Sequence, residues 1–87
     1  MNVGDWADVR PYRDYAAYFP SKAAIPGLTR VFAVELGTRN PRVRVNAVAP
    51  GVVKTRFAGV LYEGKEEEVA APYPLKRLGV PEDIGGA

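Results

Sequence analysis

The chain has 87 residues, of which 47% are hydrophobic and 25% are charged, and its formal net charge is +2. This length allows one domain at most, and the composition is that of a folded globular segment. The absence of cysteine and histidine excludes disulfides, thiolate nucleophiles, Cys/His zinc sites and catalytic triads with an imidazole base. Proton chemistry must therefore use tyrosine, lysine, aspartate or glutamate, and no metal site is expected.

The distribution of apolar and basic residues limits the partners. No apolar run approaches the roughly 18 residues of a membrane helix, and the N-terminus lacks the order of a signal peptide. We therefore expect no membrane partner and a cytoplasmic location. The basic residues are scattered rather than striped, so we expect no nucleic-acid partner. A positive field equally suits a cofactor that carries phosphate.

The first half of the chain predicts a strand end, a loop and a long helix. Residues 1–4 are typical of the end of a strand, and the aperiodic, polar and aromatic residues 5–15 predict a loop. From 16 to 38 the apolar spacing of three and four predicts a helix. The residues expected on its apolar face are Ala24, Leu28, Val31, Phe32 and Leu36.

The second half of the chain predicts one strand and two short helices. The alternating, β-branched residues 43–49 predict a buried strand that Pro50-Gly51 terminates. A short helix is expected at 63–71. Proline followed by two acids at 81–83 is typical of a helix N-terminus.

Tyr18 and Lys22 lie four residues apart at the start of the long helix, so their side chains project from one face. An ammonium group near a phenol favours the phenolate and lowers the phenol pKa from its usual value near ~10. Such a pair could act as an acid or base on one ligand. The pair taken alone is equally compatible with an amphipathic tyrosine beside a solvated lysine.

The residues around this pair resemble a known family. Tyr18-Phe-Pro-Ser21-Lys22 is similar to the motif of the short-chain dehydrogenase/reductase (SDR) family, in which three residues separate tyrosine and lysine. The helix residues Leu28-Thr29-Arg30 and the segments 43–51 and 74–84 resemble the family's downstream segments in the same order. The resemblance covers nearly the whole chain.

This resemblance implies an incomplete α/β fold. The SDR fold is a Rossmann-type, doubly wound parallel sheet, and residues 1–87 would form one partial domain from its C-terminal half. No Gly-rich turn of the kind that binds pyrophosphate is found in the chain, so the nucleotide-binding half is expected to be absent.

The resemblance also implies an NAD(P)H-dependent oxidoreductase that acts on a small carbonyl or pterin substrate. Tyr18 would donate a proton, while Lys22 would bind the nicotinamide ribose and depress the tyrosine pKa. The cofactor is NADP or NAD, and the family implies a homo-oligomer formed through the long helix when the domain is complete. Besides Tyr18 and Lys22, the residues expected at the nicotinamide end are Pro50, Gly51, Val53 and Thr55.

Asp5 is the clearest departure from the family pattern. About thirteen residues before the tyrosine the family has a serine that binds the substrate carbonyl, and aspartate replaces it here. Pteridine reductases share this replacement, so the chain resembles that subgroup and Asp5 is a third candidate catalytic residue. An ionised carboxylate only accepts hydrogen bonds and could anchor an amino-pterin ring. The alternative is a solvated loop aspartate in a divergent member of the family.

Three interpretations of the whole chain remain open. In the first, it is a piece of an oxidoreductase that neither binds NAD(P)H tightly nor turns over substrate alone. In the second, it is a non-catalytic fragment that interacts through its long helix. The third is a freestanding small α/β protein with an accidental motif.

Overall fold

The computed structural model describes all residues 1–87 and divides them into two compact units, residues 1–49 and 50–87. The first unit contains strand β1 (Asn2–Val3), the 3₁₀ helix η1 (Trp6–Val9), helix α1 (Tyr18–Arg39) and strand β2 (Ala47–Val48). The second unit contains helices α2 (Gly59–Tyr62), α3 (Glu66–Ala70) and α4 (Pro81–Gly85). None of these helices has both the length and the apolar character that a membrane span requires.

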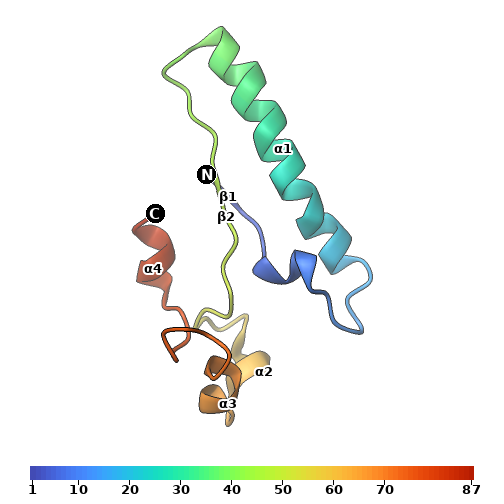
Figure 1. Cartoon of the computed structure of the whole chain (residues 1–87), viewed down its shortest axis with the longest axis vertical. Coiled ribbons are helices and arrows are strands. Elements are labelled where there is room, and N and C mark those ends of the chain that lie inside the picture. Colours follow the sequence, from blue (N-terminus) through green and yellow to red (C-terminus); the bar gives the residue numbers. More distant parts are fainter. The chain divides into compact units, whose positions relative to one another are not determined.

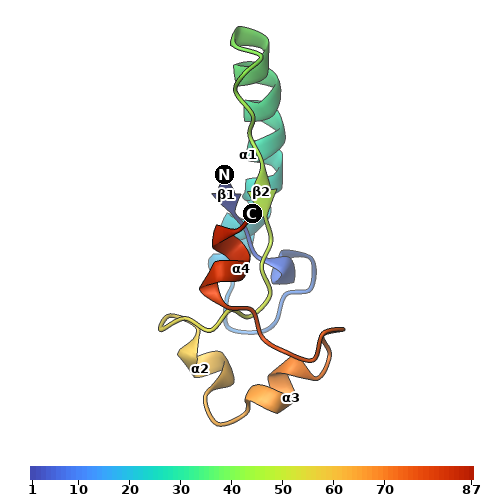
Figure 2. The same cartoon turned by 90° about the vertical axis from the view of Figure 1, so that its left-hand side faces the viewer.

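The first unit is a strand, a long helix and a parallel strand. Asn2 is paired with Ala47 and Val3 with Val48, and the backbone nitrogens of Asn2 and Gly4 each donate across the pair at 2.8 Å. Helix α1 runs beside both strands (Figures 1 and 2). A helix that connects two parallel strands is the unit from which Rossmann-type sheets are built, so the predicted fold class is confirmed for this part.

The predicted strand at 43–49 is shorter than expected, and the prediction that it is buried is wrong. Only Ala47 and Val48 form strand β2, because β1 offers just two residues for pairing. Val43 keeps 38% of its surface exposed, and Ala47 is also exposed. A parallel strand is buried only when layers cover both faces of its sheet, and in this unit α1 is the one helix beside the strands.

Helix α1 agrees with the predicted helix to within two residues at each end. It begins at Tyr18 and continues through Pro26, although proline cannot donate to the carbonyl oxygen of Lys22. It ends where the Asn40 backbone nitrogen donates to the carbonyl oxygen of Leu36 at 2.9 Å. The Asn40 side chain then accepts from the Arg42 backbone nitrogen at 3.0 Å, a local turn that asparagine favours.

The predicted apolar face of α1 is not the face that packs on the strands. The packed face includes Ile25 and Thr29, whose side-chain oxygen accepts from the Asn2 side chain at 3.0 Å. At ~100° per residue, Ala24, Leu28 and Val31 of the predicted face lie about a third of a turn away from the packed face. Apolar residues lie on several sides of this helix, so their spacing alone does not select the side that meets the strands, where Asn2 makes its polar contact. The predicted core residues that are exposed instead are Ala24, Leu28, Val31, Phe32 and Leu36.

Each unit has a small core of its own. In the first, Ala7 and Phe19 are each 5% exposed. In the second, Ala58, Ala70 and Leu78 are buried, and Leu78 is 2% exposed. So few buried side chains indicate that each unit has little apolar burial to hold it together.

The second unit is organised by a single parallel bridge between Val53 and Gly79. The Lys54 backbone nitrogen donates to the Gly79 carbonyl oxygen at 2.9 Å, and the Gly79 nitrogen donates to the Val52 carbonyl oxygen at 3.0 Å. A Cβ atom at residue 79 would lie 3.2 Å from a methyl carbon of Val53. Glycine therefore lets the two segments approach closely enough to form these bonds.

The three short helices match the sequence predictions in part. Helix α4 begins at Pro81 as predicted. Helix α3 occupies only residues 66–70 of the predicted 63–71, because Gly64 takes a left-handed conformation with φ of 74° and separates it from α2. Helix α2 was not predicted, since a single turn carries too little periodicity to be recognised.

Candidate active site

Asp5 and Tyr18 form the central contact of the first unit. The Tyr18 hydroxyl donates to Asp5 Oδ2 at 2.6 Å, and Asp5 Oδ1 accepts from the Ala7 backbone nitrogen at 2.8 Å. Asp5 is therefore the N-cap of η1, a position that aspartate favours because its carboxylate satisfies an otherwise unpaired N–H group. The loop predicted at 5–15 thus contains a helical turn that directs this carboxylate towards the tyrosine.

Lys22 lies one turn of α1 beyond Tyr18. Its Nζ is 5.7 Å from the centroid of the Tyr18 ring, within reach of a cation–π attraction. It also donates to the Val3 carbonyl oxygen at 3.3 Å. The ammonium therefore lies over the ring and at the end of β1, whereas the phenol hydroxyl points to Asp5.

The expected lowering of the Tyr18 pKa is wrong. Burial of the phenol, together with its hydrogen bond to Asp5, raises the Tyr18 pKa from 10.0 to about 12. The negative charge of Asp5 acts in the same direction because it opposes a second negative charge on the phenolate. The Lys22 ammonium lies over the ring and at the Val3 carbonyl, while Asp5 is in direct contact with the hydroxyl. Tyr18 is therefore held in its protonated, proton-donating form at neutral pH.

The four residues predicted to line the nicotinamide end lie in one short segment of the second unit. Its backbone is fixed by side chains of that unit: the Tyr73 hydroxyl accepts from the Val52 nitrogen at 3.1 Å, and Lys54 forms an ion pair with Glu66. Thr55 Oγ1 accepts from the Ala58 nitrogen at 3.2 Å. This segment comprises Pro50, Gly51, Val53 and Thr55, of which Gly51 is exposed and the other three are half-buried.

The structure thus brings the three predicted catalytic residues together in the first unit. It also shows how the aromatic side chains near the start of α1 are packed. The rings of Tyr12, Tyr15 and Phe19 lie against one another next to Tyr18, at centroid distances between 4.9 and 5.9 Å. The regular spacing of tyrosines at 12, 15 and 18 was the available signal, but aromatic residues near a helix start more often indicate plain packing.

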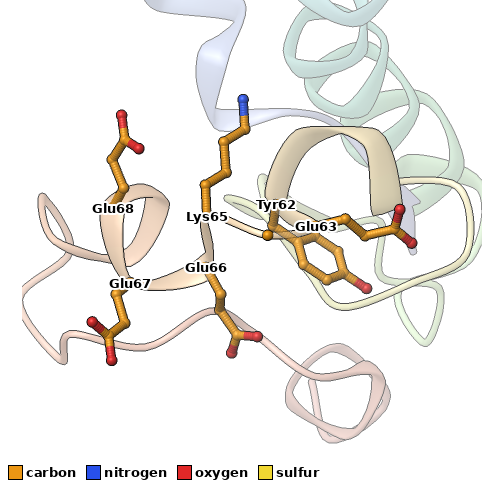
Figure 3. Close-up of a pocket in the computed structure, with 7 residues that line it drawn as sticks. Tyr62, Glu63, Lys65, Glu66, Glu67 and Glu68 are labelled. Carbon is orange, nitrogen blue, oxygen red and sulfur yellow. The ribbon is translucent and has the colours of Figure 1, made fainter.

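Two hollows offer space for a small ligand. One, of about 330 Å³, lies in the first unit between α1 and β2, and Asp5 and Asp8 line its rim. The other, of about 650 Å³, lies in the second unit and is lined by residues 62–68. In Figure 3 the carboxylates of Glu66, Glu67 and Glu68 point in different directions, and they form no metal-binding group. The acidic run is therefore a solvated surface of α3.

The chain is similar to known proteins over almost its full length. A family described as enoyl-(acyl carrier protein) reductase matches residues 2–87. Dehydrogenase/reductase SDR family member 4 from Mus musculus is 43% identical over 86 residues, which cover 97% of this chain and 30% of that protein. The Homo sapiens protein of the same name is 42% identical over the same share. The chain therefore spans about a third of the length of these relatives.

Solved structures agree with this similarity. A short-chain dehydrogenase/reductase from Brucella melitensis, described as glucose/ribitol dehydrogenase, has a TM-score of 0.84 and 33% identity, covering 97% of this chain and 33% of that one. The structure described as ElxO with NADP bound has a TM-score of 0.78 and 27% identity, covering 98% and 35%. These relatives lend no support to the pteridine-reductase subgroup. The chain belongs to the short-chain dehydrogenase/reductase family and has a partial Rossmann-like α/β fold.

Proposed function

We propose that this chain supplies the proton-donating part of an NAD(P)H-dependent oxidoreductase site and forms one partial domain. The observation that carries the proposal is the placement of Tyr18 and Lys22 one turn apart on α1, with the phenol held as a donor by Asp5. The matched relatives are described as dehydrogenase/reductases, and members of this family act on small molecules.

In the proposed reaction Tyr18 supplies a proton as negative charge develops on the substrate oxygen or nitrogen. The raised pKa weakens Tyr18 as an acid, so the transfer is driven by the negative charge that develops on the substrate atom and makes that atom the stronger base. When bound, NAD(P)H supplies the hydride. Asp5 orients the Tyr18 hydroxyl through the 2.6 Å bond, and the substrate atom would meet the hydroxyl beside this carboxylate.

The residues of the chain are chemically suited to the nicotinamide end of the cofactor. Lys22 has three N–H donors, of which the structure assigns one to the Val3 carbonyl oxygen, so two are left for ribose hydroxyls. In the second unit Gly51 exposes backbone, and Val53 and Thr55 offer an apolar surface and a hydroxyl. We propose these residues, with Pro50, as nicotinamide contacts for NADP or NAD; the similar structure described with NADP bound supports this.

Asp5 bears on the class of substrate. Its two carboxylate oxygens accept hydrogen bonds from Ala7 and Tyr18, and a carboxylate cannot donate to a substrate carbonyl as a serine hydroxyl can. We therefore propose a substrate with an N–H group beside the carbon that is reduced, as in a pterin, ahead of a simple ketone. The carboxylate is what supports this choice.

A chimera tests the proposal directly. Residues 2–87 would replace the matched segment of the mouse relative, and oxidation of NADPH would be followed with a ketone and with a pterin. We expect Tyr18→Phe to lower kcat at least about 100-fold, while Thr38→Val, which removes a hydroxyl from the last turn of α1, leaves it within a few-fold. Equal rates for the chimera and its Tyr18→Phe variant would refute the role of Tyr18.

The same chimera separates the two substrate classes. If Asp5 selects an N–H donor, Asp5→Ser should lower kcat/KM for the pterin and raise it for the ketone. For the 87-residue chain alone we expect neither tight binding of NAD(P)H nor turnover, and measurable NADPH oxidation by the purified chain would contradict this.

The exposed apolar residues of α1 favour a second, non-catalytic candidate. Val31 is 56% exposed and Val34 is 68% exposed, and helix faces of this kind commonly mark interfaces. We propose that α1 binds to a second protein chain that has the SDR fold. In sedimentation experiments Val31→Glu should weaken this association and Tyr18→Phe should leave it intact. In the chimera the pattern should reverse, because Tyr18→Phe lowers kcat and Val31→Glu leaves kcat unchanged.

A further inference from the structure

The residues just before α1 and those of its first turn form a cluster of four aromatic rings, which we call the aromatic cluster: Tyr12, Tyr15, Tyr18 and Phe19. Tyr12 meets Tyr15 at 5.1 Å and Phe19 at 4.9 Å between ring centroids, in edge-to-face arrangements. Tyr15 in turn meets Tyr18 at 5.9 Å with an angle of 68° between the rings. Edge-to-face pairs at these distances attract one another beyond simple burial.

Tyr15 is the member that connects the cluster to the candidate catalytic tyrosine. Phe19 also touches Tyr18, at 5.3 Å, but as its neighbour in the chain it follows the helix backbone. Tyr15 lies outside α1 and is placed by the loop, where Asp14 takes a left-handed conformation with φ of 74°. The Tyr15 carbonyl oxygen also accepts from the Phe19 nitrogen at 3.2 Å. Both the backbone and the ring of Tyr15 therefore contact the first turn of α1.

We propose that Tyr15 is a positioning residue for Tyr18, and that its ring fixes the orientation in which the Tyr18 hydroxyl meets Asp5. The Tyr18 side chain is met from three directions: by Asp5 at its hydroxyl, by Lys22 over its ring, and by Tyr15 with Phe19 at its edge. Of these contacts, Tyr15 alone comes from the loop between η1 and α1. The inference rests on the proposed function of Tyr18 and adds a residue to it.

The protonation of Tyr18 gives this positioning a measurable signature. The titratable and charged groups that face Tyr18 are Asp5, Tyr12, Tyr15 and Lys22. Burial is the largest cause of the raised Tyr18 pKa, and both neighbouring tyrosines add to it. Removal of the Tyr15 ring would admit water to the Tyr18 ring and loosen its bond to Asp5, and both changes lower the pKa towards 10.0.

Ring-labelled tyrosine NMR on the 87-residue chain tests the proposal without turnover, so its result is independent of whether the chain reduces any substrate. The wild type should show nuclear Overhauser contacts between the Tyr15 and Tyr18 rings. At pH 11 about a tenth of Tyr18 should be ionised in the wild type, given a pKa of about 12. In Tyr15→Leu we expect a larger ionised fraction than in the wild type at the same pH.

The variants separate positioning from a general structural role. Tyr15→Phe keeps the ring and should preserve most of the wild-type titration, and Tyr62→Phe in the second unit should leave Tyr18 unchanged. A lower melting temperature for Tyr15→Leu with an unmoved Tyr18 titration would overturn the proposal. So would the absence of ring contacts in the wild type, including the case in which the chain is unfolded. If Tyr15→Leu does not fold, Tyr15→Met takes its place in the titration.

Discussion

At the scale of single residues, the protonation of Tyr18 at the start of α1 depends on Asp5 at the start of η1, on the other side of the loop that joins the two helices. Asp5 caps η1 with one oxygen and accepts from Tyr18 with the other. The sequence correctly indicated that Asp5, Tyr18 and Lys22 belong together. It gave the wrong direction for the Tyr18 pKa, because spacing along a helix does not show where the hydroxyl points.

The link between Asp5 and Tyr18 can be measured in the chain itself. We expect Asp5→Ser to lower the Tyr18 pKa from about 12 towards 10.0, because the substitution removes both a charge and a strong acceptor. The matched control is Asp8→Asn, which removes a carboxylate from the first turn of the same helix η1. An equal fall of the Tyr18 pKa in both variants would show that general surface charge, and not the bond to Asp5, sets it.

The raised pKa of Tyr18 also predicts a pH dependence of stability. The folded state favours the protonated phenol. Its contribution to the free energy of unfolding is therefore complete below pH 10 and is lost as pH rises through about 12. The free energy of unfolding should therefore fall more steeply between pH 10 and 12 in the wild type than in Tyr18→Phe. Urea titrations at several pH values compare the two slopes, and identical slopes would contradict the prediction. The comparison of the wild type with Tyr18→Phe is needed because other tyrosines and lysines ionise in the same pH range.

At the scale of elements, the longest one was the most predictable. The spacing of apolar residues identified α1 to within two residues, and Pro81 with its acids identified the start of α4. The packed face of α1 was not predictable in the same way. Apolar residues lie on several sides of the helix, and the side that meets the strands carries the hydrogen bond from Asn2 to Thr29, residues 27 apart in the sequence.

The start of α4 depends on one carboxylate. Asp83 accepts two hydrogen bonds from the Arg77 guanidinium, at 2.8 and 3.1 Å, and one from the Val80 nitrogen at 2.9 Å. The Arg77 guanidinium, and after it the Val80 N–H, lower the Asp83 pKa from 3.8 to about 2. The stabilisation is therefore present above pH 3.8 and is lost as pH falls through about 2.

Substitution of Asp83 should release this helix start. We expect Asp83→Asn to speed hydrogen exchange of the Val80 amide several-fold at neutral pH, because the charge-assisted bonds weaken. Glu82→Gln, in the same turn, is the control and should change this exchange little. If both variants exchange at the wild-type rate, the contacts of Asp83 do not hold the start of α4.

At the scale of the whole molecule, each unit depends on very few buried side chains. Phe19 is 5% exposed and Phe57 is 85% exposed, which provides a matched pair. Phe19→Ala should cost about 3–5 kcal/mol, an amount comparable with the entire stability of a small fold. Phe57→Ala should change the free energy of unfolding by less than about 0.5 kcal/mol. Urea unfolding of both variants tests this, and a cost for Phe57→Ala as large as that for Phe19→Ala would contradict the assignment of the core.

The sequence by itself determined the family, the long helix and the residues Tyr18 and Lys22, because these depend on local spacing and on short motifs that follow one another in order along the chain. The tertiary structure decided the length of β2, the side of α1 that packs, the cluster of Tyr12, Tyr15 and Phe19 around Tyr18, and the direction of the Tyr18 pKa. Each of these depends on which distant groups come within contact distance. A tyrosine four residues from a lysine becomes a stronger or a weaker acid according to which group reaches its hydroxyl. In this chain that group is the carboxylate of Asp5, thirteen residues away.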